Sequence, residues 1–508
     1  KLEYMLGGLN VVQGKYDIEK QHKMHKLHAI ERIKYLLDDN SFHEYGSNIG
    51  SYGEEYECEK SFPYDGVITG YGYIHRKLVF IYSQDFTVCG GTVGKAHGRK
   101  IAITIKKAIE NKCPVIGICD SGGARIQEGV NALAGYGDIF FYNTLASGYI
   151  PQISIIAGTC AGGAVYSPAI TDFIFMIKNV GYMFVTGPKV IQDVTGKICS
   201  MNELGGSSIH AEYSGVAHFI SETEKECFNE VRKLIKMIPS SNILNKNENF
   251  KFSQKYFSQI GTFVPKEQRK VYDIHRIIDE LLDKNTFMEI QKKFAGNIVI
   301  GLGTFCGMTV GIVANQPKVL GGVLDSDASD KAARFVRYCD SFNIPIITLV
   351  DVPGFVPSIE QEKSGIIRHG AKLLYAYAES TVPKITLILR KAFGGAYIAM
   401  GSKHLGADAV YAWPNVQISV MGAEGAIDIL YGKILLDMGE KEKEIFKEKM
   451  EKKYSQKYMN SLTAEKEGYI DEIILPEETR EKFYQDLVAF TNKEPVIQVT
   501  KKHGNIPL

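Results

Sequence analysis

The sequence has no apolar run long enough to cross a membrane and no excess of charge of either sign. None of its 508 residues lies in an uninterrupted apolar span of about 20 residues, the length that a transmembrane helix requires. Lysine and arginine number 59 against 58 aspartate and glutamate residues, so the formal net charge is +1. This balance provides no net positive charge to attract nucleic acid or an anionic membrane surface. We therefore expect neither a nucleic-acid partner nor direct membrane insertion.

Paired cysteines are also missing. The nine cysteines form no Cys-x-x-Cys pair and are scattered over positions 58, 89, 113, 119, 160, 199, 227, 306 and 339. An odd, dispersed set is typical of reduced thiols rather than of a disulfide framework or a zinc site. The pattern predicts no bound metal and a reducing compartment, the cytoplasm, with the mitochondrial matrix as the alternative. Because the first residue is Lys1, removal of a leader before it stays an open alternative.

The signatures of nucleophilic, zinc-dependent and nucleotide-dependent enzymes are absent as well. The sequence contains no Gly-x-Ser-x-Gly, His-Glu-x-x-His or Gly-x-Gly-x-x-Gly motif, and Gly196-Lys197 lacks the earlier glycine of a phosphate-binding loop. His22, His25 and His28 lie close together in the sequence, and we interpret them as a solvated basic face rather than as ligands. ATP, dinucleotide and nucleophile chemistry are therefore poor explanations for this chain.

The chain is instead built from two copies of one unit. Matching residues recur at a spacing of 231: Gly70-Tyr-Gly72 with Gly301-Leu-Gly303, Gly90-Gly91 with Gly321-Gly322, Lys100 with Lys331, and Asp120 with Asp351. The preceding segments, 30–44 and 275–289, match at a spacing of 245, so the first copy carries an insertion between residues 45 and 70. This duplication predicts an N-terminal domain over residues 1–240, a linker over 241–268 and a C-terminal domain over 269–508.

Within each copy, apolar runs alternate with segments of helical period. Residues 114–119 and 344–350 have the composition of buried strands, and residues 101–111 and 332–342 have the spacing of amphipathic helices. The alternation predicts an α/β fold in which strands are connected through helices. The Lys- and Glu-rich segment 433–457 predicts a solvated helix.

Each copy also carries a glycine pair directly after a strand-like run. The two motifs are Gly158-Thr-Cys-Ala-Gly-Gly-Ala164 and Arg390-Lys-Ala-Phe-Gly-Gly-Ala396. A glycine pair that opens a helix presents main-chain NH groups, which bind an oxyanion. Close helix packing would also explain a single pair. Two pairs at strand-to-helix turns, where α/β proteins bind ligands, favour two oxyanion sites.

The loop Asp120-Ser-Gly-Gly-Ala-Arg-Ile-Gln-Glu-Gly129 is a further candidate. Its glycines allow main-chain NH groups to approach a carbonyl or a phosphate, and Arg125 is suited to contact a phosphate as a forked donor. The alternative is a tight strand-to-helix turn with Asp120 as a cap and Arg125 in a surface ion pair. The glycine turn recurs at Asp351-Val-Pro-Gly-Phe355, which favours the functional interpretation.

Together, these motifs resemble the carboxyltransferase (β) subunits of biotin-dependent acyl-CoA carboxylases, of the propionyl-CoA carboxylase type. The resemblance covers essentially the whole chain and extends to Phe184-Val-Thr-Gly-Pro188, Ser402-Lys-His-Leu-Gly406, Ala412-Trp-Pro414 and the tail Lys501-Lys-His-Gly-Asn-Ile-Pro-Leu508. It implies two tandem crotonase-like (ClpP/crotonase) α/β domains and a homo-oligomer, typically a hexamer. The N-terminal domain would bind acyl-CoA and the C-terminal domain would bind biotin.

The resemblance also implies the site residues. The NH groups of Gly162 and Gly163 would hold the acyl thioester oxygen, and those of Gly395 and Ala396 would hold the ureido oxygen of biotin. The implied substrate-binding residues are Ser121, Gly122, Gly123, Ala124, Arg125, Tyr397 and Ile398. Biotin would arrive as carboxybiotin on a separate carrier, because the chain has no Ala-Met-Lys-Met attachment sequence. Biotin carboxylase and the carrier are therefore expected as partner chains.

The chemistry of carboxyl transfer agrees with these residues. The acyl-CoA and the biotin each place negative charge on an oxygen, and a well-aimed NH donor is worth about 10²- to 10³-fold in rate. Deprotonated biotin would itself take the α-proton, so the site needs no side-chain base. The absence of a nucleophile motif fits this scheme.

Ile398 bears on the choice of acyl substrate. Propionyl-CoA-specific members tend to have an aspartate after the motif Gly395-Ala396-Tyr397, whereas isoleucine resembles members with broader acyl choice. The first hypothesis is carboxylation of propionyl-CoA to methylmalonyl-CoA. The alternatives are a methylmalonyl-CoA decarboxylase or transcarboxylase subunit, a broader acetyl/propionyl-CoA carboxylase, and a non-catalytic acyl-CoA-binding paralogue.

Overall fold

A computed structural model describes residues 15–23, 25–50, 63–243, 259–493 and 501–508. The chain divides into two compact units, residues 1–243 and 244–508. Most of the predicted linker, and part of the insertion predicted between residues 45 and 70, lie outside the described residues.

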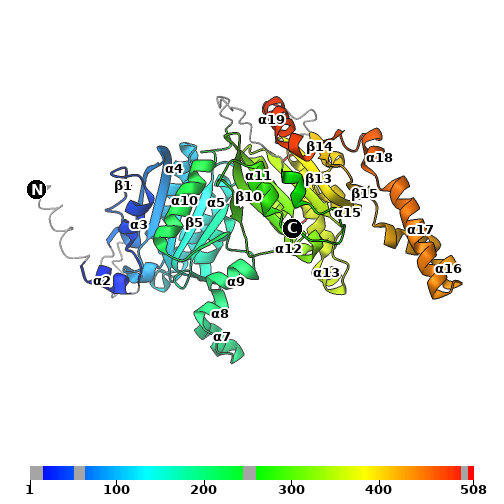
Figure 1. Ribbon diagram of the computed structural model, residues 1–508. Coiled ribbons are helices and arrows are strands. Elements are labelled where there is room, and N and C mark those ends of the chain that lie inside the picture. The colour runs from blue at the N-terminus through cyan, green and yellow to red at the C-terminus, as the bar shows by residue number, and fades with distance from the viewer. Residues whose placement is uncertain (1–14, 24, 51–62, 244–258, 494–500) are drawn as a thin grey trace, which may run out of the picture. The chain divides into compact units, whose positions relative to one another are not determined.

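An eight-stranded sheet forms the centre of the first unit (Figure 1). Its path runs β1-β2-β3-β4-β5-β6-β8, with β7 paired to the end of β5. The strands are β1 (His43–Tyr45), β2 (Val67–Ile74), β3 (Lys77–Gln84), β4 (Val115–Ser121), β5 (Gln152–Ala161), β6 (Phe173–Ile177), β7 (Tyr182–Phe184) and β8 (Phe219–Ser221). The strands from β3 to β8 pair in parallel, so their carboxyl ends meet at one edge of the sheet.

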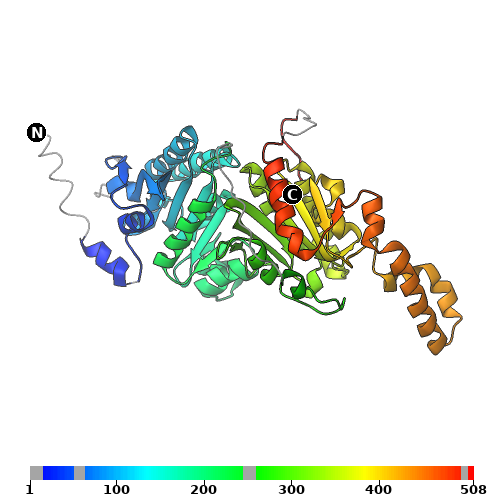
Figure 2. The ribbon, with the colours of Figure 1, turned by 45° about the horizontal axis from the view of Figure 1, so that its top comes forward.

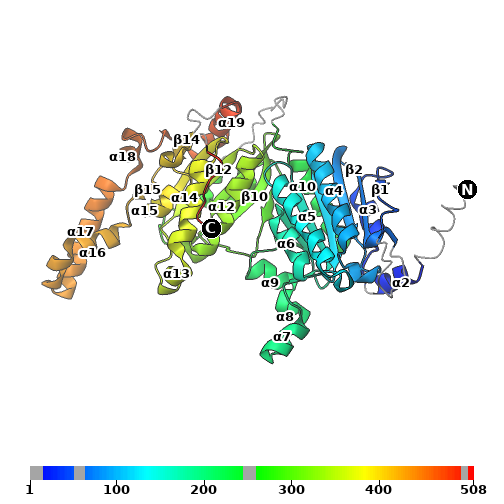
Figure 3. The same ribbon diagram turned by 180° about the vertical axis from the view of Figure 1, so that it is seen from behind.

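Helices cover both faces of this sheet. Helices α3 and α10 lie on one face, and α4 and α5 lie on the other (Figures 1 and 3). The helices are α2 (Lys15–Lys23), α3 (Ala29–Leu36), α4 (Lys95–Glu110), α5 (Val130–Ala146), α6 (Tyr166–Ile170), α7 (Pro188–Thr195), α8 (Met201–Gly205), α9 (Ser207–Glu212) and α10 (Glu224–Met237). Burial on both faces explains the continuous apolar runs of β4 and β5.

The second unit repeats this topology. Its eight-stranded sheet runs β9-β10-β11-β12-β13-β14-β16, with β15 paired to the end of β13. The strands are β9 (Met288–Ile290), β10 (Ile298–Phe305), β11 (Met308–Asn315), β12 (Ile346–Val352), β13 (Lys384–Phe393), β14 (Ala409–Ala412), β15 (Gln417–Ser419) and β16 (Glu472–Ile473). The predicted strands 114–119 and 344–350 are therefore β4 and β12, at equivalent places in the two sheets.

The helices of the second unit include one departure from the sequence prediction. They are α11 (His275–Leu281), α12 (Ser326–Ser341), α13 (Ile359–Ser364), α14 (Ile366–Glu379), α15 (Gly394–Ala399), α16 (Ala423–Leu436), α17 (Glu440–Tyr458), α18 (Ser461–Lys466) and α19 (Thr479–Phe490). The solvated helix predicted over residues 433–457 is confirmed from residue 440 onward as α17, which has no buried residue, whereas its start is wrong, because residues 433–436 belong to α16 and the chain turns at 437–439. The charged α17 packs as a hairpin against the apolar α16 (Figure 2).

The side chains that surround four glycines confirm the duplication at both the 231-residue and the 245-residue spacing. A Cβ on Gly70 would lie 2.4 Å from the Phe42 ring, and one on Gly301 would lie 2.6 Å from the Phe287 ring. Gly72 and Gly303 in turn lie against leucines at the ends of α3 and α11, Leu37 and Leu282 respectively. A side chain cannot fit at any of these four positions without moving its neighbours. The fold is therefore two tandem α/β units of one topology, as the sequence predicts.

Candidate functional site

The first glycine pair lies where β5 ends and a helical segment begins. Gly162 has a φ of +60°, which turns the chain out of the strand, and a short 3-10 helix, η4 (Gly162–Val165), leads into α6. The preceding residue, Ala161, makes no side-chain capping bond. The amides of Gly162 and Gly163 precede the first intrahelical bond, so the helix does not use them.

The second glycine pair has the same arrangement. Gly394 has a φ of +62° directly after β13, and α15 begins at that residue without a side-chain cap from Phe393. The first NH groups of a helix have no intrahelical acceptor, and here they include those of Gly395 and Ala396. Each unit thus presents uncapped helix-opening amides at the predicted residues.

The two second glycines are required for different reasons. A Cβ on Gly163 would lie 3.2 Å from the ring of Tyr136, so a side chain there requires the ring to move by a few tenths of an ångström. Gly395 is exposed and has an ordinary φ, and a Cβ on it would meet only the Phe355 ring at 4.0 Å. Neither packing nor backbone conformation within the unit requires glycine at 395. Close approach of a ligand to the main chain would require it.

The 121–124 loop lies beside the first glycine pair. Ser121 aligns with Cys160 on β5, and a Cβ on Gly123 would lie 3.0 Å from the carbonyl oxygen of Ala161. Within the loop, the Gly123 amide donates to Ser121 Oγ over 3.2 Å. The structure therefore brings Ser121, Gly122, Gly123 and Ala124 to the end of β5, next to Gly162.

Arg125 differs from its predicted role as a phosphate ligand. Its side chain is 1% exposed, and its guanidinium donates to Asp65, to Glu128 over 2.8 Å and to the Thr92 carbonyl over 2.9 Å. Its pKa is raised, since the attraction of Asp65 and Glu128 outweighs the opposing effect of burial. This geometry ties the loop to the preceding segment and turns the guanidinium away from solvent. The alternative of a surface ion pair is also wrong, because the pair is buried.

Two buried ion clusters at the ends of β4 and β12 escaped sequence analysis. Asp120 Oδ2 lies 2.6 Å from Lys26 Nζ and 3.1 Å from Arg32 Nη1, so Asp120 is not a helix cap. In the second unit, Asp351 Oδ2 lies 3.0 Å from two nitrogens of Arg390. Arg390 occupies the place of Gly158 in the matching motif, so the cation comes from the strand in one unit and from α3 in the other. A sequence signal existed, since Arg390 is a charged residue at the end of an apolar run.

The residues after the second glycine pair divide between core and surface. Tyr397 is 7% exposed, and its hydroxyl has no hydrogen-bond partner among the described residues. Burial, followed by the nearby Tyr469, raises the pKa of Tyr397 to about 12. Ile398 is 37% exposed and lies one residue further along α15. Of these two predicted substrate contacts, only Ile398 therefore offers its side chain to a ligand.

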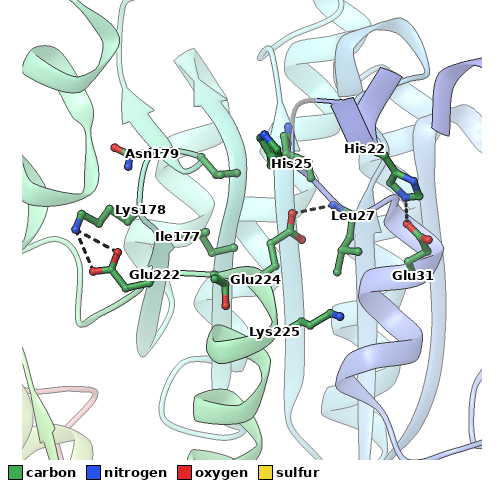
Figure 4. Close-up of a pocket in the computed structure, with 13 residues that line it drawn as sticks. His22, His25, Leu27, Glu31, Ile177, Lys178, Asn179, Glu222, Glu224 and Lys225 are labelled. Carbon is green, nitrogen blue, oxygen red and sulfur yellow. Dashed lines mark hydrogen bonds and ion pairs between the residues drawn. The ribbon is translucent and has the colours of Figure 1, made fainter. Parts of the chain in front are cut away.

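A separate cavity of about 600 Å³ lies in the first unit, beside α2 and the start of α10 (Figure 4). None of the predicted site residues lines it. Its charged groups are largely paired: His22 with Glu31 at 2.8 Å, and Lys178 with Glu222 at 3.0 Å. These contacts leave the cavity without a concentrated charge for an ionic ligand.

The predicted solvated histidine face is wrong for one of its three members. His22 and His25 are exposed, but His28 is buried. Its Nε2 lies 2.9 Å from Asp85 Oδ2, and its Nδ1 accepts the capping bond at the start of α3. Sequence spacing alone gave no sign of this burial.

In the described ranges, no group of three or more His, Cys, Asp and Glu side chains is arranged to hold a metal ion. No helix within those ranges combines the length and apolar character needed to span a bilayer. The eight cysteines whose positions are described are free thiols.

Comparisons with known proteins identify close relatives over nearly the whole chain. Residues 20–506 match the model of the carboxyl transferase domain family. The carboxyltransferase subunit of propionyl-CoA carboxylase from Haloferax mediterranei is 48% identical over 498 residues, covering 97% of this chain and 96% of the relative. The α subunit of methylmalonyl-CoA decarboxylase from Veillonella parvula is 46% identical over 501 residues, with the same coverages.

A solved structure is similarly close. The hexameric transcarboxylase 12S, with methylmalonyl-coenzyme A and methylmalonic acid bound, matches with a TM-score of 0.94 at 43% identity. The match covers 100% of this chain and 98% of that one. Both tandem units thus have counterparts in a chain of known structure.

Proposed function

We propose, from the premise that this chain belongs to the carboxyl transferase domain family, that it moves a carboxyl group between carboxybiotin and the α-carbon of propionyl-CoA. The chain is a biotin-dependent acyl-CoA carboxyltransferase. Propionyl-CoA and methylmalonyl-CoA are the favoured pair because the relatives that match are named for these acyl groups. The observation that carries the proposal is the exposed, unobstructed Gly395, which neither packing nor backbone conformation explains.

In the first unit, the amides of Gly162 and Gly163 would hold the thioester oxygen of the acyl-CoA. Loss of the α-proton, or of the carboxyl group in the reverse direction, places negative charge on that oxygen. Fixed NH donors stabilise this charge without reorganising. The 121–124 loop lies close enough to the pair to border the coenzyme, whereas Arg125 would shape the loop rather than contact a phosphate.

In the second unit, the residues at the start of α15 fit biotin. The uncapped amides of Gly395 and Ala396 suit a ureido oxygen, and the space above Gly395 admits a ring close to the main chain. When bound, biotin supplies the carboxyl group and the base for the α-proton. The chain's own residues would bind and orient that group and stabilise charge on its oxygen. We also propose that a separate chain carries the biotin and that six copies of this chain assemble, as in transcarboxylase 12S.

Turnover by the purified chain tests this function. Incubation with methylmalonyl-CoA and free biotin should give propionyl-CoA and carboxybiotin, which then loses CO2, and chromatography of the CoA thioesters measures the propionyl-CoA. Malonyl-CoA and ethylmalonyl-CoA in parallel would report how Ile398 and its neighbours treat shorter and longer acyl groups. Absence of turnover with every malonyl-type and C2 to C6 acyl thioester would contradict the proposal.

A second candidate is the carboxyltransferase subunit of a decarboxylase. The 46% identity to the Veillonella parvula α subunit and the isoleucine at 398 favour it. Both candidates use the same two sites, so turnover of the isolated chain does not separate them. Purification from the source organism does: a co-purifying ATP-dependent biotin carboxylase indicates the carboxylase, and a co-purifying membrane protein indicates the decarboxylase.

A further inference from the structure

An aromatic ring lies against the second glycine of the first pair. Tyr136, on α5, is 4% exposed, and its Cδ2 and Cε2 atoms lie 3.2 Å from the position of a Cβ on Gly163. The ring thus fills the volume that a side chain at 163 would occupy. Gly162, with its left-handed conformation and no side chain, offers little packing surface of its own. The Tyr136 ring therefore packs at the Gly163 position.

The second unit has a ring in the same place, supplied by a different element. Phe355, in the loop after β12, lies 4.0 Å from the position of a Cβ on Gly395. Its Cε1 and Cζ atoms also lie 3.2 Å from the position of a Cβ on Gly370 of α14. Phe355 therefore lies between the helix and the glycine pair, and Gly370 provides the space for it.

The helix and the loop beside the glycine pair exchange roles between the two units, because the ring is on the helix in one unit and in the loop in the other. The buried residues of α5 (Ala132, Tyr136, Ile139 and Asn143) and of α14 (Ile366, Gly370, Leu373 and Tyr377) follow the same pattern at a constant spacing, which pairs Tyr136 with Gly370. In the loops, the spacing of 231 pairs Ala124 with Phe355. One unit has the ring on the helix and alanine in the loop. The other has the ring in the loop and glycine on the helix.

We propose that Tyr136 and Phe355 are positioning residues, each of which holds the helix-opening amides of its unit in the orientation that stabilises an oxyanion. The proposal rests on the function proposed above. Different elements place a ring beside the same glycine in the two units, 3.2 Å and 4.0 Å from the position of its Cβ, so this placement is the common feature. A displacement of about 1 Å in such a donor can cost on the order of 10²-fold in rate.

The Tyr136 hydroxyl is not required for this role. It is buried beside Ser121 and has no partner with hydrogen-bond geometry among the described residues. A phenylalanine would keep the ring and remove only an unsatisfied group. We therefore expect Tyr136→Phe to turn over at close to the wild-type rate. Tyr136→Leu, which removes the ring, should turn over more slowly.

Steady-state kinetics of methylmalonyl-CoA decarboxylation with free biotin test the proposal. For Tyr136→Leu we expect kcat to fall about 10- to 100-fold with KM nearly unchanged, because the donors are misplaced while the coenzyme contacts remain. Phe228→Leu, a buried aromatic change on α10, is the matched control, and rates are normalised to folded protein. A Tyr136→Leu variant with unchanged kcat, or with a defect that Tyr136→Phe shares, overturns the proposal.

Hydrogen exchange gives a readout that does not depend on turnover. Tyr136→Leu should speed amide exchange in peptides spanning residues 162–166 and leave those spanning 394–398 unchanged, and Phe355→Leu should do the reverse. Unchanged exchange in both segments would overturn the positioning role even if the chain is an active carboxyltransferase. Failure of the unchanged chain to turn over, with the exchange pattern as expected, would instead contradict the proposed function alone.

Discussion

At the scale of single residues, each glycine pair combines two different requirements. The first glycine, Gly162 or Gly394, adopts a left-handed conformation that ends the strand. The second, Gly163 or Gly395, keeps a side chain away from the amides that follow. Gly395 combines an ordinary φ with open space, since a Cβ on it would meet only the Phe355 ring, at 4.0 Å. At Gly395, therefore, the need for glycine is explained by the proposed ligand binding and not by packing or backbone conformation.

Gly395→Val should abolish transfer while the unit stays folded. The added methyl groups would occupy the space proposed for the biotin oxygen, and loss of oxyanion donors costs about 10²- to 10³-fold in rate. Turnover is measured with methylmalonyl-CoA and biotin, and folding is monitored by thermal unfolding. The matched control is Gly432→Val on α16, where a Cβ would meet no atom within 4 Å. Near-normal turnover of Gly395→Val would contradict the assignment of the second site.

Arg390→Met should destabilise the second unit strongly. It leaves the Asp351 carboxylate buried without its cation, a change that costs about 3–5 kcal/mol of the free energy of unfolding. Trp413, the single tryptophan, is buried in the same unit, so its fluorescence during denaturation reports the loss. Adding Asp351→Asn should restore much of the stability, because no buried charge then remains unpaired. A double variant no more stable than Arg390→Met would refute this account of the cluster.

At the scale of elements, the two units anchor the start of the same helix with different groups. In the first unit, His28 before α3 contacts Asp85 after β3. In the second, Asp273 before α11 accepts a hydrogen bond from Gln316 after β11 over 2.9 Å. His275, the first residue of α11, adds ion pairs to Asp273 and to Glu289 on β9. The contact between these segments is kept while the residues that make it have changed.

The stability of the second unit should therefore depend on pH through His275. The hydrogen bond to Glu289, against the effect of burial, and the pairing with Asp273 raise its pKa to about 9 from an ordinary 6.5. A raised histidine pKa contributes stability that is full below pH 6.5 and is lost as the pH rises from 6.5 to 9. Partial exposure limits the contribution to about 1 kcal/mol.

Comparison with His275→Gln isolates this effect. Denaturation followed by Trp413 fluorescence at pH 6, 7.5 and 9 should show the unchanged chain losing its advantage over the variant as the pH rises. The buried Lys331 and Lys384, whose pKa values burial lowers to about 8, titrate in both proteins and cancel in the difference. A constant difference across these pH values would contradict the raised pKa of His275.

At the scale of the whole molecule, each unit carries a helical extension at the same point of its fold. Helices α7 to α9 follow β7, and the α16–α17 hairpin follows β15, the short strands that pair beyond the glycine motifs. The α16 helix exposes Ile429, Leu430 and Leu436, each by more than 60% in the single chain. Such an apolar surface is typical of a subunit interface.

The chain should sediment as a particle of six 56.5-kDa subunits, in keeping with the proposed assembly. Ile429→Glu combined with Leu430→Glu should shift the distribution to smaller species, because burying two unpaired carboxylates in an interface costs several kcal/mol. Sedimentation velocity at several concentrations measures both. Val488→Glu, an exposed change on α19, is the control. A monomer in the unchanged chain would contradict the assembly.

The sequence by itself determined the duplication, the α/β class and the places of both glycine pairs. These follow from local rules: repeated glycines at fixed spacing, apolar runs of strand length, and strand-to-helix turns that leave helix amides without partners. The resemblance to carboxyltransferase subunits followed from the same motifs, and the family match over residues 20–506 confirmed it.

Only the tertiary structure decided what each charged or aromatic side chain does. Arg125 and His28 look solvated in sequence but are buried against Asp65 and Asp85, residues far from them in the chain. The ring beside each glycine pair comes from α5 in one unit and from a loop in the other, so no fixed spacing could reveal it. Burial and pairing depend on which distant segments the folded chain brings together, and a linear pattern does not contain that information.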